Sequence, residues 1–428
     1  MTKNEREQII ALIQQEVVPA IGCTEPIAVA LAVAKATETL GTTPEQIDVL
    51  LSGNMLKNAM GVGIPGTGMV GLPIAIALGA LVGKSEYLLE VLKDTTPEAV
   101  EQGKQYIQEQ RIHIGQKKDT EEKLYIEITV KNGKNNATVI ISHEHTHFSF
   151  IAKNGKTLLD QSQVCATANN KNTVELSLRK IYDFATTAPY KEISFILEAA
   201  KLNSKAAELG MSKGCGHALG KTILHQPKKK FFGQHSLYAK ILSATSSACD
   251  ARMAGEIIPV MSNSGSGNQG IAATMPVVVY AQERRKSKDK LVRALIMSHL
   301  TVIYIKQSFG RLSPLCGCVV AATGSACGLT YLMDGNYEQI AFAVKNMIAN
   351  ITGMICDGAK ASCSLKVATG VSTAILSSML ALENKSVSSI EGIIENDVDQ
   401  CIRNMNAIGT KGMSKTDELV LDIMTHKK

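Results

Sequence analysis

The sequence predicts an α+β fold that is mostly helical, and two observations support this. Apolar residues recur with helical periodicity throughout the chain after about residue 175, whereas strand-like segments lie before it. Small residues dominate the apolar runs, aromatic residues make up only 4% and tryptophan is absent, which is typical of closely packed helices. We therefore predict an α/β-mixed N-terminal domain with a small antiparallel sheet, residues 1–190, and an all-helical C-terminal domain, residues 191–428.

The N-terminal domain is expected to contain both element types. Turn signals at Asn132-Gly133 and Asn154-Gly155 indicate two reversals of the chain. The expected strands cover residues 47–51, 124–130, 137–142 and 148–152. The expected helices cover residues 4–18, 26–40, 70–82 and 96–110.

The rest of the chain is expected to contain only helices. The first of them, 174–186, ends the N-terminal domain, and the others form the C-terminal domain. The expected helices cover residues 174–186, 191–209, 236–254, 269–283, 288–306, 318–333, 336–351, 364–382, 389–406 and 414–426.

Charge and composition bound the partners. The net charge of +6 is mild for 428 residues, and short basic runs such as 228–230 and 284–286 lack interleaved aromatic residues, so solvated faces explain them better than nucleic-acid binding. The polar N-terminus is no signal peptide. The uncharged stretches 69–82 and 316–333 fall short of a membrane span. We expect a cytoplasmic protein whose ten cysteines serve as buried apolar groups, metal ligands or nucleophiles.

Two cysteines, Cys356 and Cys363, lie seven positions apart in a small-residue segment, and Cys316 lies upstream in a run of similar texture. Thiolates are soft ligands that suit zinc, copper or iron–sulfur clusters. The spacing of one pair is a weak signal, and the third cysteine strengthens it.

Cys23 lies in a Gly-Cys-Thr-Glu-Pro turn that feeds the helix 26–40. A cysteine just before a helix N-terminus is expected to have a lowered pKa that favours the thiolate. The alternative is a turn cysteine with no chemistry.

The segment 262–270, Ser-Asn-Ser-Gly-Ser-Gly-Asn-Gln-Gly, precedes an apolar helix. Serial backbone N–H groups at such a position suit a substrate carboxylate or a phosphate. Part of the segment also resembles the cofactor loop of threonine-synthase-like pyridoxal phosphate enzymes. The Schiff-base lysine context, the tetraglycine loop and the alternating α/β pattern of those enzymes are missing from the sequence.

Three histidines, His143, His145 and His147, alternate between two expected strands. On a strand they would share a face and could converge on one metal ion. Solvated or hydrogen-bonded histidines at a strand end are the preferred interpretation.

Four motifs in the same order resemble the bacterial and archaeal L-cysteine desulfidase family, which is related to the α part of iron–sulfur L-serine dehydratases. They are residues 22–26, 65–71, 262–270 and 354–359, and the resemblance runs from about residue 10 to the C-terminus. Cys356-Asp357 also resembles the Cys-Asp-Pro of the serine dehydratases, but Gly358 replaces their proline.

The resemblance implies a [4Fe–4S] cluster held by three cysteines with one iron left open. It assigns Cys356, Cys363 and one cysteine of the Cys316/Cys318 pair as ligands. Cys316 is preferred because it follows a leucine as in the desulfidases, whereas the serine dehydratase pattern would suit Cys318. An open iron is a Lewis acid that can bind a carboxylate and a leaving atom.

The resemblance also implies β-elimination of sulfide from L-cysteine, giving pyruvate and ammonia, with L-serine as the rival substrate. It supports Cys23 as the base, with Lys57 and Lys366 as alternatives. The residues expected to hold the substrate carboxylate or amino group are Ser264, Ser266, Asn268 and Gln269. A homodimer is a further expectation. A pyridoxal phosphate lyase, and a non-catalytic helical protein with zinc-binding or redox-sensing thiols, are the other hypotheses.

Overall fold

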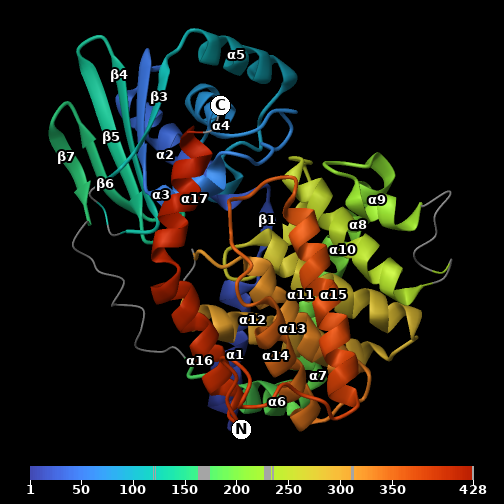
Figure 1. Cartoon of the computed structure of the whole chain (residues 1–428). Helices are drawn as coiled ribbons and strands as arrows, with labels where there is room; N and C mark the ends of the chain where they lie inside the picture. Colours follow the sequence, from blue (N-terminus) through green and yellow to red (C-terminus); the bar gives the residue numbers. More distant parts are fainter. Residues whose placement is uncertain are drawn as a thin grey trace.

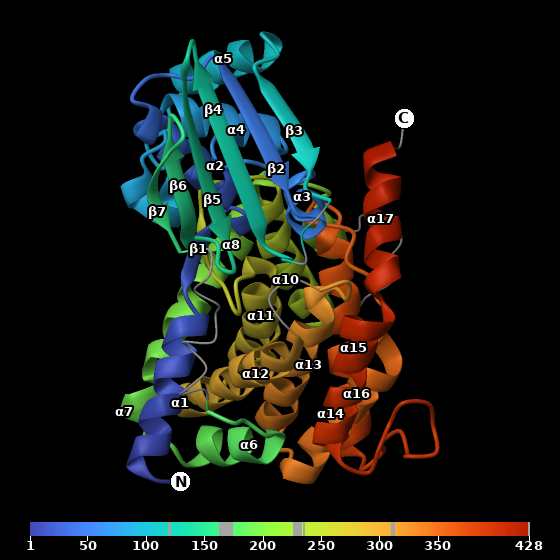
Figure 2. The same cartoon turned by 90° about the vertical axis from the view of Figure 1, so that its left-hand side faces the viewer.

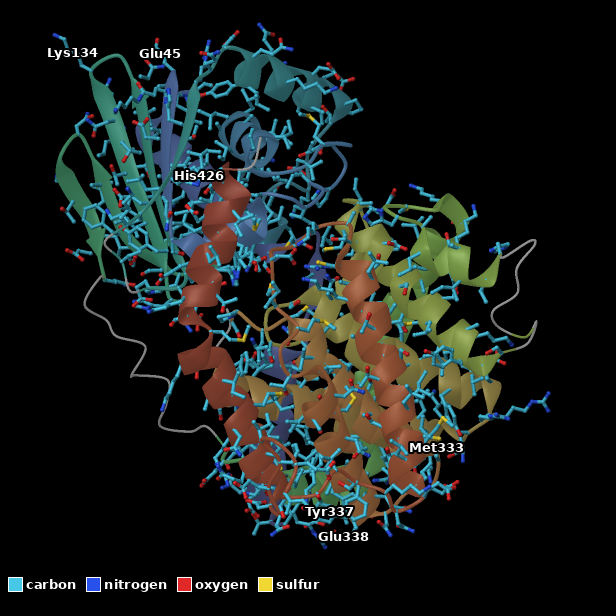
Figure 3. The ribbon with its side chains drawn as sticks, in the orientation of Figure 1. Glu45, Lys134, Met333, Tyr337, Glu338 and His426 are labelled. Carbon is cyan, nitrogen blue, oxygen red and sulfur yellow. The ribbon has the colours of Figure 1, made fainter. Side chains whose placement is uncertain are left out.

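The structure is a computed structural model that describes residues 1–118, 120, 122–161, 174–225, 233, 236–309 and 313–426. The basic run 228–230 lies outside these ranges. The chain forms two bodies, a sheet body built from α2 to β7 and a helical body built from α1 and α6 to α16 (Figure 1). Figure 3 shows Glu45 and Lys134 at the far end of the sheet body and Tyr337 and Glu338 at the opposite end of the helical body.

The sheet body contains a six-stranded sheet in the order β3-β2-β4-β5-β6-β7. Its strands are β2 (Gln46–Leu51), β3 (Ile112–Gln116), β4 (Tyr125–Asn132), β5 (Asn135–Ser142), β6 (Phe148–Lys153) and β7 (Lys156–Asp160). Both predicted Asn-Gly turns join adjacent strands, β4 to β5 and β6 to β7. The sheet is small and mixed, and not wholly antiparallel as expected, because β3 pairs parallel to β2. A parallel pair needs a long crossover, which the helices between β2 and β3 provide.

Those helices and α2 cover the sheet with small side chains. They are α2 (Thr24–Leu40), α3 (Gly53–Ala59), α4 (Leu72–Leu81), the short 3₁₀ segment η1 (Ser85–Glu90) and α5 (Pro97–Gln108). A Cβ at Gly79 of α4 would lie 2.7 Å from the carbonyl oxygen of Ala30 in α2. The two helices therefore approach each other backbone to backbone, as the small-residue composition predicts.

The helical body begins with α1 (Lys3–Glu16) and continues after the sheet. Its other helices are α6 (Leu178–Thr187), α7 (Tyr190–Ile193), η4 (Ser194–Ile196), α8 (Leu197–Lys213), α9 (Leu219–Leu224), α10 (Leu237–Met253), α11 (Gly267–Glu283), α12 (Lys288–Phe309), α13 (Gly317–Leu332), α14 (Tyr337–Ile351), α15 (Cys363–Leu382) and α16 (Val398–Ala407). Glycines again allow close contacts, since a Cβ at Gly324 of α13 would lie 2.5 Å from the carbonyl oxygen of Ser298 in α12.

Most predicted helices are confirmed within a few residues, and the helix predicted over 389–406 is wrong in its first half. Gly392 has a φ of 59°, in the left-handed region, and the Asp397 side chain accepts a hydrogen bond from the Asp399 amide to begin α16 at Val398. The range 191–209 is divided among α7, η4 and α8. The helices α3 and α9 and the strands β3, β7, β1 (Pro19–Ile21) and β8 (Pro259–Met261) were not predicted.

The two bodies exchange segments at both ends of the chain. Ile9 and Ile13 of α1 belong to the core of the helical body. At the other end the π-helical segment η5 (Ile408–Gly412) leads into α17 (Ser414–His426), whose Leu421 belongs to the core of the sheet body. Figure 2 shows α1 running along the helical body and α17 rising beside α3. The division into 1–190 and 191–428 stays a prediction.

Among the described helices, α15 is long and apolar enough to cross a membrane by length and composition. Its residues Val367, Val371 and Ala374 are buried, and the helix packs against α10, α13 and α14. Packing within the helical body accounts for this face of the helix, whereas Leu376, Met379 and Leu380 lie on an exposed face.

Candidate active site

A two-stranded ribbon brings together two motifs that are distant in the sequence. β1 and β8 pair antiparallel. Cys23 follows β1, and the segment 262–270 follows β8. The amide of Ser262 donates a hydrogen bond to the carbonyl oxygen of Val18 (2.8 Å), and the Thr24 hydroxyl donates to that of Gly265 (3.0 Å). The start of α2 and the loop before α11 therefore form one continuous wall.

The loop fits beneath the first turn of α11 because of a glycine. A Cβ at Gly270 would lie 1.9 Å from the carbonyl oxygen of Met261. The Ser266 side chain accepts a hydrogen bond from the Gln269 amide and caps the helix.

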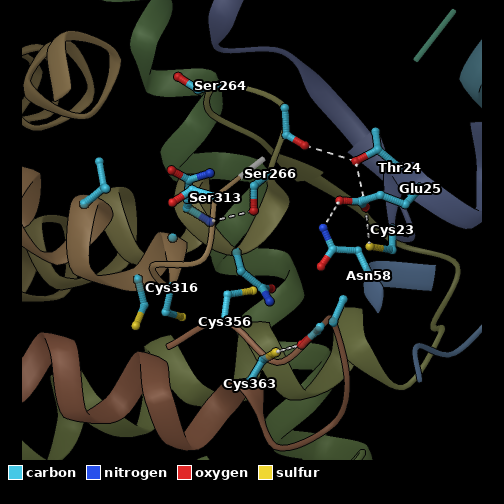
Figure 4. A pocket seen from close by; sticks show the side chains of 18 of the residues that line it. Cys23, Thr24, Glu25, Asn58, Ser264, Ser266, Ser313, Cys316, Cys356 and Cys363 are labelled. Atoms are coloured by element: carbon cyan, nitrogen blue, oxygen red, sulfur yellow. Dashed lines mark hydrogen bonds between the residues drawn. The ribbon is translucent and has the colours of Figure 1, made fainter. Parts of the chain in front are cut away.

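This wall faces a cavity of about 110 Å³, well above the roughly 10–15 Å³ that one water molecule occupies. All eight residues predicted for the site line it: Cys23, Ser264, Ser266, Asn268, Gln269, Cys316, Cys356 and Cys363. Figure 4 shows Cys316, Cys356 and Cys363, the predicted ligands, on one side and Cys23 with Thr24 and Glu25 on the other. The structure thus brings together every predicted site residue, whereas their roles stay predictions.

Cys23 lies in a hydrogen-bonded group of three side chains. Its thiol donates to Oε2 of Glu25 (2.9 Å), and Nδ2 of Asn58 in α3 donates to Oε1 of the same carboxylate (3.2 Å). All three side chains are buried. Both oxygens of the carboxylate are therefore engaged, and one of them accepts a hydrogen bond from the protonated thiol.

The expected lowering of the Cys23 pKa is wrong. Burial raises the pKa of this thiol well above its ordinary value, and the adjacent Glu25 carboxylate raises it further. The Arg252 guanidinium lowers the pKa of Cys23 but does not outweigh these two causes. Cys23 does lie at the start of α2, as predicted, but burial and the neighbouring negative charge keep its thiol protonated.

Cys316 and Cys356 are placed by a local pairing of their chain segments. Leu315 and Ile355 form an isolated antiparallel bridge. The Cys316 amide donates to the carbonyl oxygen of Met354 (2.9 Å), and the Cys356 amide donates to that of Pro314 (2.6 Å). The bridge fixes the two cysteines side by side.

Cys363 joins them from the first turn of α15, and its thiol lies 3.6 Å from the carbonyl oxygen of Gly358. Burial raises the pKa of Cys363 to about 11, and the nearby Cys316 and Cys356 raise it as well. This mutual electrostatic influence reflects three thiols that share one side of the cavity.

Cys318 also reaches the cavity, but its thiol is turned toward Met354, whose sulfur lies 3.2 Å away. Hydrogen bonding from Cys318 lowers the pKa of Cys316, whereas the same interaction and burial raise that of Cys318. Cys316 is therefore the member of the pair that ionises first. This difference favours Cys316 as the ligand.

Among the described residues, no group of three or more histidine, cysteine, aspartate or glutamate side chains is arranged to hold a single metal ion. A cluster makes a different demand, because each thiolate binds its own iron and the sulfurs need not converge on one point. Three thiols on one side of a cavity are the number and type of donors that an iron–sulfur cluster with one open iron would require. The residues present therefore fit a cluster better than an isolated ion.

Gly358 explains why the loop departs from the Cys-Asp-Pro pattern. Its φ is 90°, which proline cannot adopt, and a Cβ there would lie 2.3 Å from the carbonyl oxygen of Lys57. The loop between Cys356 and Cys363 thus packs directly on α3.

Neither alternative base lines the cavity. The Lys57 ammonium forms an ion pair with Asp417 of α17, and that of Lys366 forms one with Asp357. An ammonium held by a carboxylate gives up its proton less readily. Cys23 is better placed than either lysine.

The three histidines separate, because residues 143–147 form turns and not a strand. His145 is buried and lines the cavity, whereas Nδ1 of His143 lies 3.3 Å from Glu122 and Nδ1 of His147 lies 3.3 Å from the carbonyl oxygen of Ser142. The possible three-histidine metal site is not formed among the described residues.

Several cavity residues were not predicted: Glu25 and Asn58 as thiol partners, His145 as a cavity residue, Arg252 and Lys306. For Arg252 a signal existed, because Asp250 and Arg252 are the charged residues of an otherwise uncharged stretch from Ile241 to Met253. Glu25 stands at a helix start, where an acidic residue is ordinary, and nothing local marks Asn58.

Comparison with known proteins agrees with this arrangement. Residues 86–422 match the family described as serine dehydratase alpha chain. The chain is also similar over its whole length, and over the whole length of the relatives, to UPF0597 proteins of Bacteroides fragilis (67% identical), Porphyromonas gingivalis (52%) and Oleidesulfovibrio alaskensis (46%). The family match covers far more than half of the chain and includes the segments that carry Cys316, Cys356 and Cys363. The chain belongs to the serine dehydratase alpha chain family, together with the UPF0597 proteins.

Proposed function

We propose that this protein is an iron–sulfur lyase that eliminates sulfide from L-cysteine, giving pyruvate and ammonia. Membership of the serine dehydratase alpha chain family supports a lyase that acts on a β-substituted amino acid. The observation that carries the proposal is that Cys23, residues of the loop 262–270 and the three thiols line one cavity. One site thus combines a base, groups for an amino acid and the donors for a Lewis acid.

Cys316, Cys356 and Cys363 would hold a [4Fe–4S] cluster in this proposal. When bound, the cluster would supply a Lewis acid to the leaving group of the substrate. Three protein thiolates leave one iron open. The isolated bridge between Leu315 and Ile355 supports this proposal, because it sets Cys316 and Cys356 next to paired residues.

Cys23 would remove the α-proton. A thiol with a raised pKa is a strong base once ionised, which suits a weakly acidic α-proton. Glu25 accepts the hydrogen bond from the thiol, and Asn58 holds the carboxylate in position. The thiol would lose its proton to solvent before the substrate reacts. The thiolate would then accept the proton from Cα.

The elimination balances without an external oxidant. The C–H electron pair at Cα forms the double bond, and the sulfur departs from Cβ with its bonding pair as sulfide. The product, 2-aminoacrylate, tautomerises to an imine that water hydrolyses to pyruvate and ammonia. No further protein group is needed for these last steps.

L-Serine is the second candidate substrate, and the family description favours it. The same base and the same cavity would serve a hydroxyl leaving group. Hydroxide is the poorer leaving group, so the serine reaction depends more strongly on the Lewis acid.

We also propose that the protein works in a reducing cytoplasm. The cysteines that the structure describes are all free thiols, five of them at the cavity. The homodimer and the lack of nucleic-acid and membrane partners stay predictions.

The experiment is an assay of anaerobically purified and reconstituted protein with L-cysteine and L-serine in parallel, without added pyridoxal phosphate. We expect a broad visible iron–sulfur band, and pyruvate release accompanied by sulfide when L-cysteine is the substrate. Pyruvate from L-serine alone would replace the lead substrate by the second. A sharp aldimine band, or no chromophore and no pyruvate from either amino acid, would contradict the proposed function.

A further inference from the structure

Arg252 is a buried cation next to the proposed base. It lies in the last turn of α10, is 3% exposed and lines the cavity. A Cβ at Gly267 would lie 2.3 Å from its Nε atom, so the glycine of the loop makes room for this side chain. The guanidinium is therefore held beneath the first turn of α11.

The structure describes no counter-ion for it. Within the described residues the Arg252 side chain makes no hydrogen bond or ion pair, and its buried Nε has no partner. The Glu25 carboxylate is engaged by Cys23 and Asn58. Oδ2 of Asp250 accepts a hydrogen bond from the Gly220 amide, and its Oδ1 has no partner among the described residues, so neither oxygen is bonded to Arg252. A buried charge without a partner is costly, so its burial points to an anion that binds in the cavity.

Two hydrogen-bond acceptors face the same cavity as the Arg252 guanidinium, which is a donor. Oδ1 of Asn268 and Oε1 of Gln269 are buried and have no partner among the described residues. The side-chain nitrogen Nδ2 of Asn268 lies 3.3 Å from the sulfur of Met253. Oδ1 of Asn268 is therefore directed away from that sulfur. One cation and two acceptor oxygens match a carboxylate and an ammonium group on a single small molecule.

We propose that Arg252 binds the α-carboxylate of an L-α-amino acid substrate, while Asn268 and Gln269 accept hydrogen bonds from its ammonium group. This inference rests on the proposed function only for the reaction that follows binding. A guanidinium donates two parallel hydrogen bonds to a carboxylate and thereby fixes its orientation. The bound amino acid would present its Cα proton to Cys23.

The rival anion is the cluster with its thiolates. If Arg252 served the cluster, its replacement would lower the iron content. If it serves the substrate, iron content is retained and only amino-acid binding weakens. The two roles thus differ in a measurement that needs no activity.

The test uses reconstituted full-length protein with Arg252→Gln, Arg252→Lys and, as the matched control, Arg403→Gln, which removes an arginine charge from the exposed face of α16. Iron per chain is measured first. Binding of L-alanine, which lacks a leaving group, is then measured by calorimetry, and propionate tests the carboxylate alone. Steady-state kinetics with L-cysteine and L-serine follow.

We expect Arg252→Gln to weaken L-alanine binding about tenfold to a hundredfold, because a charge-assisted hydrogen-bonded pair is lost. Lysine should restore part of the affinity, since it keeps the charge without the fork. The KM should rise at unchanged iron content, and Arg403→Gln should match the wild type.

A second variant, Gly267→Ala, keeps the guanidinium but displaces it, so it reports on the same contact if Arg252→Gln folds poorly. Unchanged L-alanine affinity in both variants, no L-alanine binding by the wild type, or loss of iron with retained affinity would overturn the inference. Arg252-dependent binding without any elimination would uphold it while refuting the proposed lyase.

Discussion

Glu25 controls how readily the Cys23 thiol loses its proton. The carboxylate accepts a hydrogen bond from the thiol at 2.9 Å, and its charge and this bond both raise the pKa of Cys23. Burial is the larger cause of the same shift. Activity that requires the thiolate should therefore increase toward alkaline pH.

Replacing Glu25 by glutamine should move the ascending limb of the kcat/KM profile to lower pH. The direction follows because the substitution removes a negative charge that stabilises the protonated thiol. The measurement is the pH dependence of pyruvate release. Glu45→Gln, which changes an exposed residue of the sheet body, is the control. A limb that stays in place or moves to higher pH would show that Cys23 is not the titrating base.

At the residue scale the sequence indicates which side chains take part better than it indicates their state. The eight residues that line the cavity could be predicted because each belongs to a motif whose residue types suit binding or catalysis. The protonation state of Cys23 could not be predicted, since it depends on burial and on Asn58, which comes from another element. The sequence marks Arg252 only as one of two charges in an uncharged stretch, and its position beside the cavity depends on the packing of α10 beneath Gly267.

The loop 262–270 owes its position to the short ribbon of β1 and β8. The ribbon has few hydrogen bonds, so the close packing of α11 on β8 supports it. Gly270 makes that packing possible, because a Cβ would lie 1.9 Å from the carbonyl oxygen of Met261.

Gly270→Ala should therefore separate the loop from β8. Overpacking of this kind costs about 1–3 kcal/mol, so we expect a melting temperature lower by a few degrees and weaker L-alanine binding. Differential scanning calorimetry and titration calorimetry check the two effects. Gly412→Ala, at an exposed glycine whose Cβ would have its nearest contact at 4.0 Å, should change neither. Equal behaviour of the two variants would show that this contact does not support the loop.

At the element scale, long apolar helices were predictable and short connecting elements were not. The range predicted for α14 is nearly that of the structure, because a capping box at Asn336 and helical periodicity coincide. Strands β1 and β8 pair although they lie far apart in the sequence, and each is too short to show a detectable periodicity. The helix expected over 389–406 shows the converse, since one glycine and one capping aspartate overrule the apolar pattern.

An ion pair holds the C-terminal helix against the sheet body. Lys57 of α3 is 2% exposed and pairs with Asp417 of α17. The carbonyl oxygen of the same lysine packs against Gly358, in the loop between Cys356 and Cys363. The C-terminal helix, the sheet body and the proposed ligand loop are thus mechanically linked.

Asp417→Asn should destabilise the protein by about 3–5 kcal/mol, because it leaves a buried ammonium without its carboxylate. The matched control is Asp422→Asn, which removes the exposed partner of His426 on the same helix and should cost little. Thermal unfolding of both variants measures the difference. The double variant Lys57→Met, Asp417→Leu should recover much of the loss. Equal stability of the two single variants would contradict the proposed link.

At the molecular scale the fold class was predictable from composition and periodicity, and the arrangement of the bodies was not. The exchange of α1 and α17 depends on contacts between residues that are distant in the sequence. Ile9 packs in the core of the helical body and Leu421 packs in the core of the sheet body. The parallel pairing of β3 likewise follows from a crossover that no local pattern marks.

The central claim is that Cys316, Cys356 and Cys363 hold one cluster, and iron and acid-labile sulfide per chain test it most directly. Anaerobically reconstituted wild type and Cys318→Ala should contain about four of each. Alanine at Cys316, Cys356 or Cys363 should lower both contents sharply. Full iron content in any of these three variants, or its loss in Cys318→Ala with retention in Cys316→Ala, would contradict the assignment.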